Sequence, residues 1–214
     1  MSGNYKVQQG DHLSSIAKAF GFSDYNTIWN DPNNADLKSL RVNPNVLYPG
    51  DSLYIPDKVP TQYPKPTDQV HQFVKNVPQL TLCLVLEDLY EKPIANATCQ
   101  LQVGGTSSSV TTDGTGRIQQ TIPADAHDAT LIIQDPQTPF QGISIPIKIG
   151  NLDPVDQVSG QVARLNNLGY FPGDGTDATA LESAVEEFQC DNSLTVDGVC
   201  GAQTQATLKQ VHGC

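Results

Sequence analysis

The chain has 214 residues, with 12 basic and 23 acidic side chains and a formal net charge of −11 at pH 7. This length allows one large domain or two to three small ones, and small domains have thin cores that lean on neighbours or disulfides. Binding to phosphate groups needs clustered Lys and Arg, which the sequence lacks, so we exclude nucleic acid and anionic membrane surfaces as partners.

The N-terminal sequence Met-Ser-Gly-Asn-Tyr-Lys-Val lacks the apolar core of a signal peptide. No apolar run approaches the roughly 18 residues of a membrane span. These features predict a chain that is made in the cytoplasm, does not insert into a membrane and does not use the general secretion route, unless a leader has been removed.

A short strand and an amphipathic helix open the first predicted module, residues 4–58. Tyr5-Lys6-Val7-Gln8 alternates as a strand does, and Gly10-Asp11 ends it with a turn. Asp11 is the expected N-cap, because its carboxylate can accept from the free amides of the following helix. Apolar residues then recur at the spacing of one buried helical face, and Gly21 ends the helix. These residues are Leu13, Ile16, Ala17 and Phe20.

A second short helix carries Tyr25, Ile28 and Trp29 on one side, and we expect Trp29 in the core of so small a module. A helical turn through Leu37 and Leu40 follows. The segment Leu53-Tyr54-Ile55 is a strand that Pro56 stops. The predicted order is therefore strand, helix, helix, strand.

This module resembles a LysM domain through two motifs. The first is Tyr5-x-Val7-x-x-Gly10-Asp11-x-Leu13-x-x-Ile16-Ala17-x-x-Phe20-Gly21, and the second is Pro44-Asn45-x-Leu47-x-Pro49-Gly50-Asp51-x-Leu53-x-Ile55-Pro56. LysM domains are βααβ units that bind N-acetylglucosamine polymers such as peptidoglycan and chitin between the loop after the first strand and the loop before the second. The resemblance implies ligand contacts from Gly10, Asp11, His12 and Leu13 and from Asn45, Val46, Leu47 and Tyr48.

Two features set this LysM-like module apart. His12 stands where the family usually has a small hydroxyl residue, and the connection from Asp31 to Asn43 is long and rich in Asn and Pro. Copies with this insertion and the wording Leu-Arg-x-Asn-Pro-Asn-x-Leu-Tyr-Pro-Gly-Asp are similar to those that accompany type VI secretion and phage-tail-like injection machines. The resemblance implies a spike, tube or effector protein of such a machine as an alternative partner.

Residues 59–78 form a Pro-rich linker, and three prolines between Pro60 and Pro66 predict a stiff, extended spacer. From residue 79 to 152, short alternating strands separated by turns predict an all-β sandwich. The expected strands are Leu80–Glu87, Thr98–Val103, Ser108–Thr112, Arg117–Ile122, Ala129–Gln134 and Ile143–Ile149.

Two stretches of the sandwich, Pro93-Ile94-Ala95-Asn96-Ala97 and Thr112-Asp113-Gly114-Thr115-Gly116, resemble the immunoglobulin-like, transthyretin-like repeats that act as spacers in bacterial surface and toxin proteins. A calcium loop at Asp113 is disfavoured against a plain turn, because one carboxylate cannot supply about six to eight oxygen ligands.

Three helices joined by glycine turns are predicted for residues 153–214, over 156–168, 180–189 and 204–211. This region resembles the three-helix peptidoglycan-binding domain through Leu165-Asn166-x-Leu168-Gly169-Tyr170, Ala184-Val185-x-x-Phe188-Gln189 and Leu194-x-Val196-Asp197-Gly198-x-x-Gly201-x-x-Thr204-x-x-x-Leu208. The usual Asp-Gly-x-x-Gly turn is replaced by Asp174-Gly175-Thr176-Asp177-Ala178. The resemblance implies ligand contacts from Tyr170, Asp197 and Thr204, positions that also have packing or turn roles.

The five cysteines are Cys83, Cys99, Cys190, Cys200 and Cys214. The cluster at the C-terminus favours a bridge among Cys190, Cys200 and Cys214, with buried thiols as the alternative. A bridge between Cys83 and Cys99 is disfavoured because Cys83 falls out of phase with the neighbouring leucines. A metal site is disfavoured too, since no CxxC or nearby histidine pair supports one.

No residue constellation predicts catalysis. The histidines lie in separate segments, and no HExxH, GxSxG, Cys-His or P-loop pattern occurs. Glu186 and Glu187 are expected to face solvent on a helix. The histidines are His12, His71, His127 and His212.

The sequence therefore predicts a multidomain α+β chain: a βααβ LysM module, an all-β sandwich and a three-helix domain, arranged as a rod with a wall-binding fold at each end. The expected function is non-enzymatic binding to the glycan or stem peptide of peptidoglycan, without a cofactor, tethering or targeting the chain to the bacterial cell wall. The alternative is a structural, adaptor or cargo-loading part of an injection apparatus in which LysM docks protein. Either could involve export to a periplasmic or extracellular wall.

Overall fold

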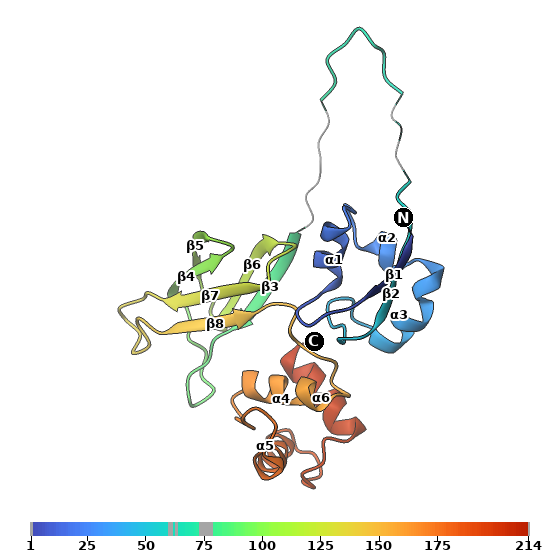
Figure 1. Ribbon diagram of the computed structural model, residues 1–214. Helices are drawn as coiled ribbons and strands as arrows, with labels where there is room; N and C mark the ends of the chain where they lie inside the picture. Colours follow the sequence, from blue (N-terminus) through green and yellow to red (C-terminus); the bar gives the residue numbers. More distant parts are fainter. Residues whose placement is uncertain (1, 60–61, 63, 73–78, 214) are drawn as a thin grey trace.

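The computed structural model describes residues 2–59, 62, 64–72 and 79–213. Its strands and helices form three groups in chain order, each with its own apolar core. Figure 1 shows the N-terminal α/β group, the β-sandwich and the C-terminal helical group lying against one another. This arrangement confirms the mixed α+β class and corrects the expectation of a rod.

The N-terminal group is a two-stranded antiparallel sheet with short helices packed on it. Strands β1 and β2 pair so that Gly3 lies opposite Ile55 and Lys6 opposite Ser52. The structure has the expected strand and helix order, and the predicted helical turn is a full third helix. The elements are β1 (Gly3–Lys6), α1 (Leu13–Ala19), α2 (Asn26–Trp29), η1 (Pro32–Asn34), α3 (Ala35–Arg41) and β2 (Ser52–Ile55).

The core of this group matches the predicted apolar face, with two exceptions. Leu13, Ile16 and Trp29 are buried as expected. Phe20 is 37% exposed because α1 ends at Ala19, and its ring instead meets the edge of the Tyr5 ring at 5.4 Å. Leu40 is 62% exposed, on the outer side of α3.

The middle group is a sandwich of a two-stranded sheet, β3–β6, and a four-stranded sheet ordered β5-β4-β7-β8. Both sheets contribute to one core, in which Ile118 of the first packs with Leu101 and Leu131 of the second. The strands lie within a few residues of their predicted positions. They are β3 (Gln79–Val85), β4 (Thr98–Val103), β5 (Thr106–Thr111), β6 (Arg117–Pro123), β7 (Asp128–Ile133) and β8 (Ser144–Lys148).

The Asp113 turn has the predicted structural role. Its Oδ1 accepts from the Thr115 and Arg117 amides at 2.8 and 3.0 Å and from the Thr115 hydroxyl at 2.7 Å. These hydrogen bonds, led by the hydroxyl, lower the pKa of Asp113 below its ordinary value. The carboxylate is therefore occupied in closing the turn.

The C-terminal group contains α4 (Val158–Asn167), α5 (Ala178–Asp191) and α6 (Ala202–His212). Leu165, Phe188 and Leu208 are at most 1% exposed and form the centre of its core. Val158 and Val211 are 54% and 48% exposed, because each lies in a terminal turn of its helix. None of the described helices is long and apolar enough to cross a membrane.

Cys190 and Cys200 carry free thiols, so no bridge joins them. Cys190 is exposed, whereas Cys200 packs against the C-terminal core, and burial raises the pKa of the Cys200 thiol to about 11. A pairing with Cys214 concerns a residue outside those described. Cys83 and Cys99 are also unbridged, with Cys83 exposed and Cys99 buried.

The predicted spacer does not separate the first two groups. Among its described residues, 64–72 form neither helix nor strand and turn back at Thr67 and Asp68. Figure 1 shows this part of the chain standing away from the rest, while α1 lies close to the sandwich. Residues 56–78 therefore connect two groups that already touch.

Candidate functional site

The structure brings the two predicted ligand loops of the LysM-like group together. We call residues 10–13 the first loop and residues 45–48 the second loop. The Leu13 amide donates to Pro44 O at 3.3 Å, beside the second loop, and the Gly50 amide donates to Val7 O at 2.8 Å. Backbone contacts at the ends of β1 and β2 thus hold the two loops next to each other.

Asp11 closes the turn before α1 and does not cap the helix. Its Oδ2 accepts from the Tyr5 hydroxyl and the Gln8 amide, both at 2.8 Å. Burial, followed by the hydrogen bond and charge of Asp11, raises the pKa of Tyr5 to about 12. The prediction of Asp11 as N-cap is wrong because the helix begins one residue later than that role requires.

His12 is the N-cap of α1 and is 1% exposed. The Ser15 amide donates to His12 Nδ1 at 3.4 Å, and the His12 amide donates to Ser15 Oγ at 3.2 Å, which completes a capping box. His12 Nε2 lies 3.4 Å from the carbonyl oxygen of Ala126 in the sandwich. An amide donor on one ring nitrogen and a carbonyl acceptor on the other fix the neutral imidazole with its proton on Nε2.

The sandwich covers the first loop. His127 Nδ1 donates to Gly10 O at 3.2 Å, and the Lys18 ammonium lies 2.6 Å from Asp125. Gly150, which follows β8 with φ +77°, packs so tightly that a Cβ there would lie 2.5 Å from Gly10 O. The connection between β6 and β7 and the segment after β8 thus pack directly on the first loop.

Of the eight predicted LysM contacts, only Asn45 is exposed. Gly10, Asp11 and Tyr48 are partly exposed, and the other four are buried. The Arg41 guanidinium lies over the Tyr48 ring, 5.6 Å from its centroid. The structure assembles the predicted groove residues but leaves few of their surfaces to solvent.

A cleft of about 670 Å³ lies between the LysM-like group and the C-terminal helices. Arg41 donates to Asp51 through Nε at 2.8 Å and Nη2 at 3.0 Å, and its Nη1 lies 3.8 Å from Asp156. On the other wall, Arg164 Nη1 donates to the carbonyl oxygens of Asp153 and Gly160, both at 2.8 Å. These bonds make the two arginines supports of the cleft walls. The sequence carried no signal for the role of Arg164, because these two acceptors are backbone atoms.

Two of the three C-terminal candidates meet around Gln189, which is 1% exposed. Gln189 Nε2 donates to Asp197 Oδ1 at 2.8 Å and to Thr204 Oγ1 at 3.1 Å, while its Oε1 accepts from the Asp197 and Gly198 amides, both at 3.0 Å. Gln189 thus supports the turn that carries two candidate residues, a role that the sequence motif alone did not predict. Beside this turn, Val196 and Val199 are 52% and 62% exposed.

Tyr170, the third candidate, has other partners. Its hydroxyl donates to Asp191 at 3.2 Å, and its ring meets Phe188 edge-on at 5.4 Å. Burial, followed by the charge of Asp191, raises the pKa of Tyr170 to about 12. Tyr170 is therefore a neutral, half-buried residue beside the core.

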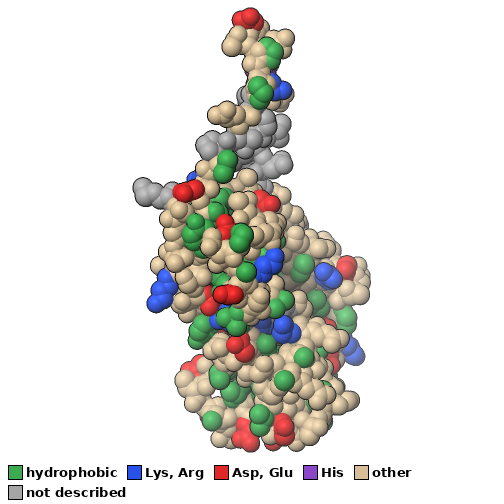
Figure 2. All heavy atoms as spheres, turned by 90° about the vertical axis from the view of Figure 1, so that its right-hand side faces the viewer, with side chains coloured by type: hydrophobic (Ala, Val, Ile, Leu, Met, Phe, Trp, Pro, Cys, Tyr) green, Lys and Arg blue, Asp and Glu red, His purple; other side chains and the backbone are tan. Residues whose placement is uncertain are grey.

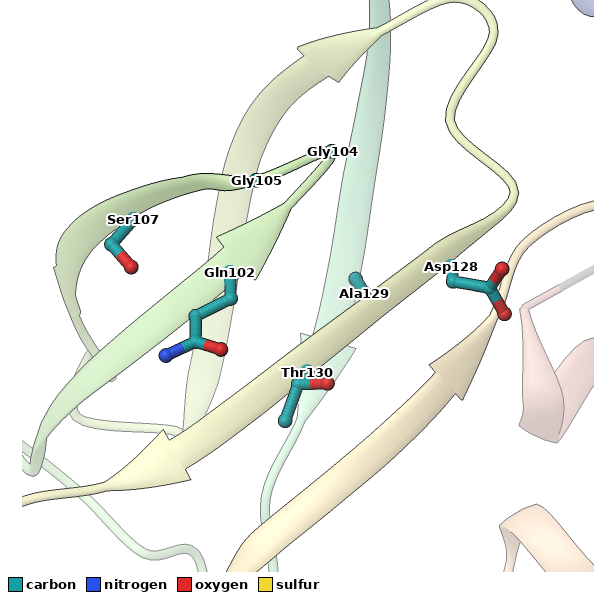
Figure 3. Close-up of a pocket in the computed structure, with 7 residues that line it drawn as sticks. All are labelled: Gln102, Gly104, Gly105, Ser107, Asp128, Ala129 and Thr130. Atoms are coloured by element: carbon teal, nitrogen blue, oxygen red, sulfur yellow. The ribbon is translucent and has the colours of Figure 1, made fainter.

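A second hollow, of about 360 Å³, lies on the sandwich at the β4–β5 turn (Figure 3). Gln102 and Thr130 face each other across β4 and β7, and Gly104-Gly105 forms the turn. Its one charged lining residue, Asp128, pairs with Lys148 at 2.5 Å. None of the predicted ligand contacts lies there.

Among the described residues, surface charges of both signs are mixed, and acidic side chains are not gathered into a ligand set. On the face in Figure 2, Lys and Arg side chains are interspersed with Asp and Glu. Glu186 and Glu187 are exposed on α5, as predicted. Within the described part of the chain, no group of three or more His, Cys, Asp or Glu side chains is placed to hold a metal ion.

Comparison with known families locates two domains. The LysM domain model matches residues 5–38, and the model described as a putative peptidoglycan binding domain matches residues 156–208. No curated protein and no solved structure matches the chain. The chain therefore contains a LysM domain at its N-terminus and a peptidoglycan-binding domain at its C-terminus, with a β-sandwich between them that neither family model covers.

Proposed function

We propose that this protein binds bacterial peptidoglycan without cleaving it and thereby tethers or targets the chain to the cell wall. The observation that carries the proposal is the presence of two peptidoglycan-associated binding families on one chain. Both are binding domains, which fits a role without catalysis. Two weak sites on one polymer gain avidity when their spacing lets both engage.

The C-terminal domain is the better candidate for first contact with the wall. Its turn around Asp197 is held by Gln189 and presents the exposed side chains of Val196 and Val199. The acetamido methyl of an amino sugar, or an alanine side chain of a stem peptide, would pack on these side chains. The first loop of the LysM domain, by contrast, lies under the sandwich.

Sedimentation with purified, insoluble peptidoglycan tests this proposal. We expect the full chain to be retained, and the double variant Val196→Asp, Val199→Asp to lose about tenfold in affinity, since two apolar contacts are replaced by charges. Val158→Asp is the matched control, because Val158 is as exposed but lies on α4. Lack of retention of the full chain would contradict peptidoglycan binding, and release of soluble wall fragments would contradict the absence of catalysis.

A second candidate function is supported by the cover over the first loop. The first loop of the LysM domain is in contact with another part of the same protein, because His12 and Gly10 bond to Ala126 and His127 of the sandwich. A LysM domain that docks protein would suit an adaptor or cargo-loading part of a type VI secretion-like apparatus, delivered to a target cell wall. Co-purification of a spike or tube protein with the full chain would support this candidate, and the absence of any such partner in cells that assemble the apparatus would contradict it.

A further inference from the structure

We propose that His12 is an acid-sensitive latch that holds the first loop of the LysM domain closed against the sandwich at neutral pH and releases it when the imidazole takes up a proton. If the LysM domain binds peptidoglycan as proposed, acid makes a second wall-binding site available. Only this consequence of the inference rests on the proposed function. The latch itself is a property of the chain without ligand.

The closed contact uses both nitrogens of one buried ring. Nδ1 accepts from the Ser15 amide within the LysM domain, and Nε2–H donates to Ala126 O in the sandwich. A proton on Nδ1 removes the lone pair that accepts from Ser15. Because His12 is 1% exposed, the resulting cation also has no access to water while the contact is closed.

The charged and titratable groups around His12 come from three segments. Asp11 belongs to the first loop, and its carboxylate is committed to Tyr5 and Gln8. Lys18 of α1 pairs with Asp125 of the sandwich at 2.6 Å. His127, also from the sandwich, has its ring centroid 5.9 Å from that of His12. After β8, Gly150 packs on the His12 ring and brings no charge.

Burial is the main influence and lowers the pKa of His12 below its ordinary value. The hydrogen bond to Ala126 O and the charges of Asp11 and Asp125 oppose that shift, and the charge of His127 adds to it. In the released conformation the imidazole returns to an ordinary pKa of about 6.5. The closed contact is therefore most stable above that pH and weakens as the pH falls below it, by up to about tenfold in the opening equilibrium per pH unit.

The covalent structure permits this release. Residues 56–78 separate β2 from β3 in sequence, and a chain of that length can span well over 20 Å (roughly 3.3 Å per residue). The segment after β8 meets the first loop at Gly150, before α4 begins at Val158. The LysM domain can thus move off the sandwich while both remain attached.

Hydrogen exchange of the full chain without ligand, measured between pH 7.5 and 5 and corrected for intrinsic exchange, tests the latch. We expect exchange in segments 10–16 and 124–128 to rise about tenfold per pH unit below about 6.5. Segment 28–37, in the LysM core, should change little. His12→Ser keeps a helix-capping side chain but cannot titrate, so its exchange in the two segments should not depend on pH.

His71→Ser is the matched control, because His71 is exposed and bonded to Pro66 O in the linker region. It should behave as the unsubstituted chain. Corrected exchange that is flat in the unsubstituted chain, or that rises equally in His12→Ser, would overturn the proposal. Peptidoglycan retention is measured separately at pH 7.5. If acid raises exchange in the two segments but the chain is not retained on peptidoglycan, the proposed function is refuted and the latch stands.

Discussion

The two recognised domains differ in what they do with their candidate ligand residues. In the LysM domain, His12 and Leu13 are 1% and 0% exposed, and the sandwich covers the loop that carries them. In the C-terminal domain, the candidate turn stays on the surface and is supported from beneath by Gln189. A family match therefore identifies a binding fold in both places, whereas the neighbouring part of the chain covers the first loop in one of them and leaves the candidate turn exposed in the other.

The largest expected effect comes from removing the support of the exposed turn. Gln189→Ala leaves the Asp197 and Gly198 amides without their acceptor, so we expect a loss of about 3 kcal/mol in the free energy of unfolding of the C-terminal domain. Chemical denaturation followed by far-UV circular dichroism measures it. Gln203→Ala is the control, because Gln203 is an exposed residue of α6. Equal stability of the two variants would show that Gln189 does not stabilise the turn.

Breaking the Arg41 pair tests the second loop. The side chains of Arg41 and Asp51 are 7% and 8% exposed, so Asp51→Asn leaves a buried guanidinium without its hydrogen-bonded counter-charge. We expect a loss of about 3 kcal/mol or slightly less in the free energy of unfolding. Asp156, at 54% exposure and 3.8 Å from Arg41, provides the control Asp156→Asn, with an expected loss of about 0.5 kcal/mol. Thermal unfolding of both variants measures the difference, and a reversed order would contradict this account of the pair.

Gly150→Ala would turn the covered loop into an open one. The new Cβ would lie 2.5 Å from Gly10 O, and we expect the closed contact to weaken by about 2 kcal/mol. Gly142→Ala separates backbone strain from collision, because Gly142 has φ +86° with no atom within 4 Å of the added Cβ, and it should cost about 1 kcal/mol without opening. Small-angle scattering at pH 7.5 should show an expanded chain for Gly150→Ala alone; an unchanged radius would mean that the contact absorbs the methyl group.

The smallest effect concerns the ion pair at the edge of the same contact. Lys18 and Asp125 are 41% and 48% exposed, so Lys18→Ala should weaken closure by no more than about 0.5 kcal/mol and by less at high salt. Exchange of segment 124–128 at low and high salt measures this effect. If Lys18→Ala weakened closure as much as Gly150→Ala does, the ion pair, and not the buried His12 ring, would be the main source of the stability of the closed contact.

Local patterns predicted most of the elements. Alternation in Cys99, Leu101 and Val103 placed β4 and its buried face, and the spacing of Leu13, Ile16 and Ala17 placed α1. The helix cap was mispredicted because Asp11 and His12 are adjacent and both can cap. Which one does so depends on Tyr5 and Gln8, which draw the Asp11 carboxylate into the turn.

The sequence by itself determined that the chain has two recognisable wall-binding folds around a sandwich, because turn glycines and apolar periodicity are local properties that survive in any arrangement of the domains. Only the tertiary structure decided that the first loop is covered. That outcome depends on the fit of His12 against Ala126 O and of Gly150 against Gly10 O, contacts between residues more than a hundred positions apart. No periodicity or motif records such a contact, since its energy arises from burial and close approach once each domain has folded.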